Sequence, residues 1–177
     1  MKNDIASYIA TVGRDARESS RIIGSASSAS KSEALKQIAA AVDGARAAIR
    51  DENAKDMAAA EHNGIDQPLI DRLLLNDKGI DQMIEGILQV DALKDPVGEM
   101  SDFSYRPTGI QIGKMRVPLG VIAMIYESRP NVTVDAASLS LKSGNACILR
   151  GGSEAFHSNQ AIAACVTQGL VAADLPA

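Results

Sequence analysis

Two short apolar runs decide the fold of this chain: Leu119-Gly120-Val121-Ile122-Ala123-Met124-Ile125 and Ala146-Cys147-Ile148-Leu149. Continuous runs of this length are typical of strands buried on both faces of a parallel sheet. Between them, a helix is expected to begin at Asn131 or Thr133 and to run to Leu141, ending at Gly144-Asn145. A second helix follows, from Glu154 to about Leu170. Because a strand–helix–strand crossover is right-handed, the pattern predicts the opening βαβα of a Rossmann-like parallel sheet.

The first hundred residues instead carry helical periodicity. Apolar residues repeat at i, i+3, i+4 and i+7 from Leu35 to Ile49 and from Ile80 to Leu88. The serine-rich stretch Ser25–Ser30 could be a flexible linker, but its length suits a capped turn between helices. Residues 1–100 are therefore expected to be helical, giving an α/β fold whose N-terminal layer is helical.

Residues 101–117 have the turn residues and alternating pattern of a β-hairpin. An isolated hairpin is marginal in water, and Ile110, Ile112 and Met115 have nothing nearby in sequence to cover them. We therefore expect a two-stranded oligomerisation arm, which pairs with a second chain or packs under a further domain. The expected assembly is a homo-oligomer, a dimer or higher.

Composition narrows the class of protein. The chain has 177 residues, 46% of them hydrophobic, and a net charge of −4, with 3% aromatics and no Trp. These values argue against a nucleic-acid-binding protein, which needs clustered positive charge or stacking aromatics. No apolar run approaches the ~20 residues that span a bilayer, and the start does not read as a signal peptide. A soluble, cytoplasmic protein with reduced cysteines is expected.

The expected ligand edge lies after the two strands, because ligands of open parallel sheets bind beyond the carboxyl ends of the strands. The segments there are Tyr126–Asn131 and Arg150–Glu154. Gly151-Gly152 lets backbone N–H groups approach a ligand, and Arg150 offers a fixed positive charge for a phosphate. Neither the glycine-rich dinucleotide fingerprint nor a P-loop is present, so an ordinary turn with an exposed arginine stays an alternative.

Other reactive side chains are interpreted as structural. Cys147 lies within an apolar run and Cys165 in mid-helix, and neither has a neighbour that would lower its thiol pKa. No metal site is expected, because His157 has no partner at metal-ligand spacing; it is expected to be an exposed helix residue. Lys142 is expected to be a solvated charge at a helix C-terminus.

The chain resembles the gamma-glutamyl phosphate reductase family, which belongs to the aldehyde dehydrogenase superfamily. The resemblance lies in an ordered series of motifs over residues 118–155, namely Pro118–Ile122, Glu127–Asp135, Leu141–Ala146 and Ile148–Ala155. The helical segment adds Asp71-Arg72-Leu73 and Asp95-Pro96-Val97-Gly98. The resemblance therefore covers nearly the whole chain and implies an incomplete aldehyde dehydrogenase-like fold.

This resemblance implies a reaction and a set of site residues. The family reduces gamma-glutamyl 5-phosphate to glutamate 5-semialdehyde and phosphate with NADPH, in proline biosynthesis. Asn131 matches an asparagine that helps to hold the oxyanion, although it could also be a helix N-cap. Arg129 would bind the acyl-phosphate substrate or form a surface salt bridge. Cofactor binding is carried over to Glu127, Ser128, Arg150, Gly151, Gly152, Ser153 and Glu154, although the superfamily has a different sequence at 150–154.

The resemblance also implies what lies outside these residues. The family's nucleophilic cysteine belongs to a later catalytic domain that is absent from this chain. Residues 1–100 would be the helical part of the cofactor domain, 101–117 the arm and 118–177 the start of the NADP-binding domain. We expect no reductase activity from the 177 residues alone, and association with glutamate 5-kinase is a further expectation for the intact enzyme. The alternative is a catalytically inactive cofactor-binding or assembly module.

Overall fold

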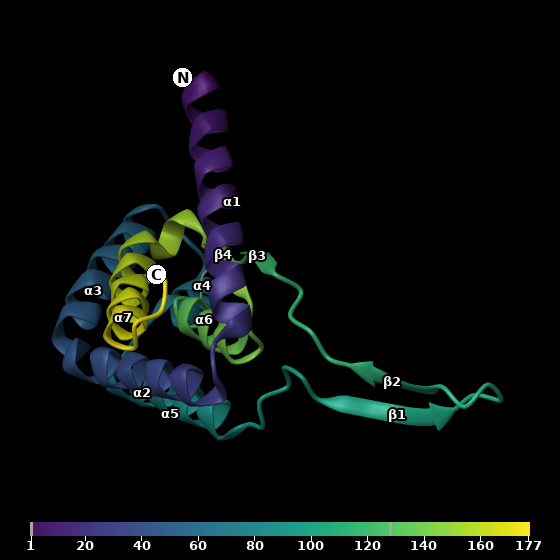
Figure 1. Cartoon of the computed structure of the whole chain (residues 1–177). Coiled ribbons are helices and arrows are strands. Elements are labelled where there is room, and N and C mark those ends of the chain that lie inside the picture. Colours follow the sequence, from purple (N-terminus) through teal and green to yellow (C-terminus); the bar gives the residue numbers. More distant parts are fainter. Residues whose placement is uncertain (1, 128) are drawn as a thin grey trace.

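The two apolar runs form neighbouring parallel strands, as the sequence predicts (Figure 1). The computed structural model describes residues 2–127 and 129–177. Its elements are α1 (Lys2–Ser25), α2 (Ser28–Gly44), α3 (Arg46–His62), α4 (Gln67–Leu73), α5 (Asp77–Ala92), β1 (Met100–Tyr105), β2 (Gln111–Met115), β3 (Val121–Ile125), α6 (Asn131–Lys142), β4 (Ala146–Arg150), the 3₁₀ turn η1 (Ser153–Ala155) and α7 (Phe156–Ala172).

Gly144 and Asn145 form the turn between α6 and β4, where the crossover returns to the sheet. Gly144 has φ +75°, a left-handed conformation that glycine adopts without steric cost and that ends α6. The side chain of Asn145 then accepts a hydrogen bond from the Gly120 N–H at 2.8 Å. This bond aligns the start of β3 with the start of β4, so that Val121 lies opposite Ala146 and Ile125 opposite Arg150.

Helix α2 lies at the centre of the hydrophobic core. It packs against α5 and α7, and Leu35, Ile38 and Val42 are fully buried. The backbones of α2 and α7 approach closely at Gly169, where an added Cβ would lie 2.5 Å from the Ile38 nitrogen. The serine-rich stretch is a capped turn, since the Ser27 side chain accepts a hydrogen bond from the Ser30 N–H.

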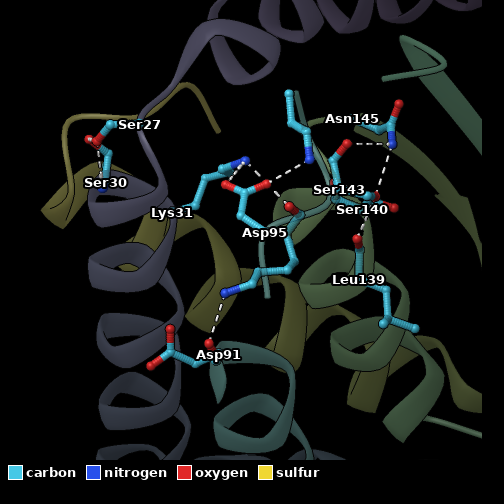
Figure 2. A network of polar contacts seen from close by, with 11 residues as sticks. Ser27, Ser30, Lys31, Asp91, Asp95, Leu139, Ser140, Ser143 and Asn145 are labelled. Atoms are coloured by element: carbon cyan, nitrogen blue, oxygen red, sulfur yellow. Dashed lines mark hydrogen bonds and ion pairs between the residues drawn. The ribbon is translucent and has the colours of Figure 1, made fainter. Parts of the chain in front are cut away.

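A buried polar network joins α2, α5 and α6 (Figure 2). Lys31, only 1% exposed, forms an ion pair with Asp95 at 2.5 Å and donates to the Lys142 carbonyl at 3.4 Å. The Lys142 ammonium in turn donates to the Asp91 carbonyl at 2.8 Å. The sequence-based prediction of a solvated Lys142 is wrong: the side chain is buried, because the C-terminus of α5 supplies an acceptor from 51 residues away.

The β1–β2 hairpin extends away from the helices (Figure 1). All its residues are exposed, including Phe103 and Ile112. The Phe103 ring lies across Gly113, where an added Cβ would meet it at 2.7 Å. This aromatic–glycine contact stabilises the strand pair, and the predicted hairpin is confirmed.

The expected burial of β3 on both faces is wrong for the described residues. Ala123, Met124 and Ile125 are exposed, and Ile125 is 76% exposed. The physical reason is that the described sheet has β4 as the single neighbour of β3.

The helices were also compared with the length and hydropathy that a membrane span needs. Among the described residues, none has a stretch that is both apolar and long enough to span a bilayer.

The contact at Gly169 gives a stability prediction. Gly169→Ala should lower the free energy of unfolding by about 1–3 kcal/mol, because the new methyl group meets the backbone of α2. The matched control is Gly13→Ala in α1, where an added Cβ meets nothing within 4 Å. That substitution should stabilise the helix by up to about 1 kcal/mol through helix propensity. Urea unfolding measures both, and an equal gain at the two positions would contradict the close α2–α7 packing.

Candidate functional site

The carboxyl ends of the two parallel strands form one edge, as predicted. The Tyr126 N–H donates to the Arg150 carbonyl at 3.1 Å and extends the strand pairing by one residue. Glu127 and the loop Arg150–Glu154 therefore leave the sheet side by side. This edge is where an open parallel sheet binds its ligands.

A chain of hydrogen bonds fixes this edge to helices α6 and α7. The hydroxyl groups of Tyr126 and Thr133 are 2.6 Å apart, and Thr133 donates to the side-chain oxygen of Asn159 at 3.0 Å. The Asn159 amide in turn lies directly against Gly151, where an added Cβ would collide with it. The residue that follows β3, helices α6 and α7, and the glycine loop are thereby held together. The sequence does not mark Tyr126, Thr133 and Asn159 as positioning residues, because their contacts depend on how β3, α6 and α7 pack.

The first turn of α7, which follows the loop, is capped from α3. The buried carboxylate of Asp56 accepts hydrogen bonds from the His157 N–H at 3.1 Å and from the Ser158 N–H at 2.8 Å. It also accepts from the Ser158 hydroxyl at 2.6 Å. An acidic group at a helix N-terminus satisfies free N–H groups and complements the helix dipole. The end of the loop is therefore anchored to the helical layer. The His157 side chain is exposed, as predicted.

The loop Arg150–Glu154 carries two charged side chains, Arg150 and Glu154. The Arg150 guanidinium is exposed and makes no hydrogen bond or ion pair with any residue the structure describes. The carboxylate of Glu154 lies over Gly152, where a Cβ would collide with it. Both glycines therefore serve close approach of side chains, and neither has a positive φ. An exposed guanidinium can pair with a phosphate group, so the chemistry of the loop is compatible with a nucleotide.

Asn131 lines a pocket on the helical side of the edge, between α4, α5 and α6. It is the first residue of α6, and the N-cap position is taken by Pro130, which makes no side-chain cap. The interpretation of Asn131 as an N-cap is therefore wrong. Its amide instead donates to the Asp135 carboxylate at 3.0 Å, and both residues line a pocket of about 220 Å³ together with residues of α4 and α5.

The remaining predicted site residues lie on the loop before α6. Glu127 and Arg129 are exposed, and the Arg129 guanidinium has no bonding partner within residues 2–127 and 129–177. The alternative interpretation of Arg129 as part of a surface salt bridge therefore finds no support in the described residues. Ser128, a predicted cofactor residue, lies outside them.

Neither cysteine is placed for catalysis. Cys165 is buried in α7 and Cys147 is half-buried in β4. Burial raises the pKa of both thiols, and for Cys147 a hydrogen bond with Ser140 offsets this only in part. A raised pKa lowers the thiolate fraction at neutral pH and with it the reactivity. Among the residues described, no three His, Cys, Asp or Glu side chains gather as a metal site.

Comparison with solved structures identifies two close relatives. The gamma-glutamyl phosphate reductase of Thermotoga maritima is 44% identical, with a TM-score of 0.88 over 92% of this chain and 39% of that chain. The gamma-glutamyl phosphate reductase of Saccharomyces cerevisiae is 32% identical, with a TM-score of 0.87 over 92% of this chain and 41% of that chain. The chain thus spans about two fifths of the length of these relatives.

More distant structures share the fold. A probable aldehyde dehydrogenase from Listeria monocytogenes has 17% identity and a TM-score of 0.67, over 96% of this chain and 35% of that chain. The aldehyde dehydrogenase-like fold expected from the sequence is therefore confirmed. No family model matches the chain.

The two thiols give a pH-dependent prediction. At neutral pH both should react with iodoacetamide more slowly than free cysteine, because their raised pKa values leave less thiolate. The rate should increase only in the alkaline range, above the pKa of an ordinary cysteine. In guanidinium chloride both should react like free cysteine, which serves as the control. A thiol that reacts faster than free cysteine in the folded chain would contradict this assignment.

Proposed function

The chain belongs to the gamma-glutamyl phosphate reductase family, and we propose that it is part of an enzyme that reduces gamma-glutamyl 5-phosphate to glutamate 5-semialdehyde. In this reaction the bond between the acyl carbon and the phosphate oxygen breaks, phosphate leaves, and a hydride is added to the acyl carbon. The observation that carries the proposal is the parallel β3–β4 edge with its charged loop, in a chain 44% identical to a solved reductase.

The proposed cofactor is NADPH, which when bound supplies the hydride. Arg150 would pair with its ribose phosphate, because a guanidinium forms two parallel hydrogen bonds with such a group. Glu127 and Glu154 would accept from ribose hydroxyls, while Ser153 and the backbone of Gly151 and Gly152 complete the loop. We include Ser128 from the sequence resemblance alone. The anchored base of the loop supports this role, since a fixed site loses less entropy on binding.

The proposed roles on the substrate side belong to Asn131 and Arg129. An amide nitrogen has two hydrogens, so Asn131 can keep its bond to Asp135 and donate the second hydrogen to the oxyanion that forms on the acyl carbon. Arg129, with a guanidinium free in the described part of the chain, would hold the leaving phosphate. The nucleophilic thiolate would come from a cysteine outside these 177 residues, because burial raises the pKa values of both thiols present.

The arm supports a second candidate function, that of a catalytically inactive cofactor-binding or assembly module. Its apolar side chains, among them Phe103, Ile110 and Met115, are exposed. Pairing of two arms would cover them, so we propose a homo-oligomer. Association with glutamate 5-kinase and a cytoplasmic location are further proposals that follow from the family.

A chimera tests the proposed function. This chain replaces the matching part of the Thermotoga maritima reductase, and the assay follows phosphate-dependent reduction of NADP⁺ with glutamate 5-semialdehyde. We expect the chimera to be active and the 177-residue chain alone to be inactive, because the covalent step needs a thiolate. A soluble, folded chimera without activity would favour the assembly module.

Arg150 tests the cofactor assignment in the same chimera. Arg150→Ala should raise the KM for NADP⁺ at least about tenfold, since a charge-assisted hydrogen bond contributes about 1.5–3 kcal/mol, and should change the KM for NAD⁺ less. The matched control is Arg17→Ala, an exposed helix arginine of α1 far from the loop in sequence. Equal effects on the two cofactors would contradict a contact between Arg150 and the ribose phosphate.

A further inference from the structure

The pocket that contains Asn131 holds more charge than an oxyanion site requires. It has a volume of about 220 Å³ and lies where α4, α5 and the start of α6 meet. Its polar side chains are Arg72, Gln82, Asn131 and Asp135, and its apolar walls are Leu74, Leu75 and Met83. A small pocket in which a few polar groups converge is typical of a small-molecule site.

Hydrogen bonds fix the backbone next to Arg72, while the Arg72 guanidinium has no partner among the residues described. The Asn53 amide donates to the Leu73 carbonyl at 2.8 Å, and the Leu75 N–H donates to the Asn53 side-chain oxygen at 2.8 Å. Asn53 is buried, so these two bonds fix the turn directly after Arg72. The Arg72 guanidinium is exposed at the pocket and has no hydrogen bond or ion pair with the residues described. It is therefore available to an anionic ligand.

Asp135 is the complementary charge. Burial raises the pKa of its half-buried carboxyl, and the hydrogen bond from Asn131 opposes this shift only in part. No lysine or arginine in the described part of the chain pairs with it. Its second oxygen lies near Gly86 of α5, 3.7 Å from where a Cβ would be. Gly86 lines an adjoining hollow, and Asp135 lines both this hollow and the pocket of Arg72. A carboxylate that is partly desolvated and lacks a cation is ready to bind an ammonium group.

We propose that this pocket binds the α-amino-acid end of the glutamyl substrate, with Arg72 holding the α-carboxylate and Asp135 the α-ammonium. The assignment rests on the proposed function, which places the acyl carbon near Asn131. Asn131 and Asp135 lie one turn apart on the same face of α6. Their side chains are hydrogen-bonded at 3.0 Å, which leaves the second amide hydrogen and the second carboxylate oxygen as neighbouring binding groups. The substrate has the same arrangement, with the reacting acyl group at one end and a zwitterion at the other.

The pairing of charges also determines the class of ligand. A site for a simple anion such as phosphate would be weakened by the neighbouring Asp135 carboxylate, since like charges oppose binding. A zwitterion satisfies both residues at once. The pocket would thus select free α-amino acids with a γ-acyl group and would disfavour the corresponding simple aldehydes or acids.

Binding of substrate analogues to the ¹⁵N-labelled chain tests the proposal by NMR. L-Glutamine keeps the α-carboxylate and α-ammonium and carries an uncharged γ-acyl group, so it should shift the signals of Gly79, Gln82 and Asn131. L-Glutaminamide, the α-amide of glutamine, lacks the α-carboxylate but keeps the γ-amide, and N-acetyl-L-glutamine lacks the ammonium. Each should bind at least about tenfold more weakly, because each loses one charge-assisted hydrogen bond. Inorganic phosphate is the comparison anion.

Variants assign the two contacts. Arg72→Met should remove the preference for glutamine over glutaminamide, and Arg72→Lys should keep part of it. Asp135→Asn should remove the preference for glutamine over its N-acetyl form. Arg17→Met, in α1, is the matched control and should leave both preferences unchanged. Unchanged spectra outside the pocket show that each variant is folded.

Two results would overturn the proposal: phosphate shifting the pocket signals more strongly than glutamine, or glutamine leaving them unchanged. The active chimera separates this proposal from the proposed function. There, Arg72→Met should raise the KM for glutamate 5-semialdehyde at least about tenfold with a smaller change in kcat. An active chimera with an unchanged KM would refute the role of Arg72 alone. An inactive chimera whose pocket still discriminates glutamine from its analogues would refute the reductase function and keep the amino-acid site.

Discussion

A buried lysine sets the arrangement of this chain. Lys31, at the start of α2, is 1% exposed and forms an ion pair with Asp95, in the loop that leaves α5 for the arm. Burial acts to raise the pKa of Asp95, but Lys31 and the Val97 N–H outweigh it, and the pKa lies below its usual range. Breaking one side of such a pair leaves a buried charge and costs about 3–5 kcal/mol. The loop therefore has to return to α2.

The same network joins the ends of two helices that carry the proposed substrate pocket (Figure 2). Lys31 also binds the carbonyl of Lys142, and the Lys142 ammonium binds the Asp91 carbonyl. The C-termini of α5 and α6 are thereby held together, and the proposed substrate pocket lies between their N-terminal halves. Directly after α6, Asn145 aligns β3 with β4, whose far ends carry the Arg150 loop.

Local signals in the sequence were sufficient to predict the elements and their order. Helical periodicity, the serine-rich turn at Ser25–Ser30 and Gly144 in a left-handed conformation all act within a few residues. The two apolar runs predicted the parallel pair, and the carboxyl ends of these runs predicted the ligand edge. The partner of Lys142 and the pocket that joins Arg72 to Asp135 could not be predicted, because each depends on how helices far apart in sequence pack.

A double-mutant cycle on Lys31 and Asp95 tests the central claim most directly. Lys31→Met, Asp95→Asn and the double variant are unfolded in urea at neutral pH, and the free energies of unfolding are compared. If the buried pair holds the loop to α2, each single variant loses about 3–5 kcal/mol, and the double variant loses at least about 2 kcal/mol less than the sum. Losses that add within about 0.5 kcal/mol would contradict the account, since the two residues would then act independently.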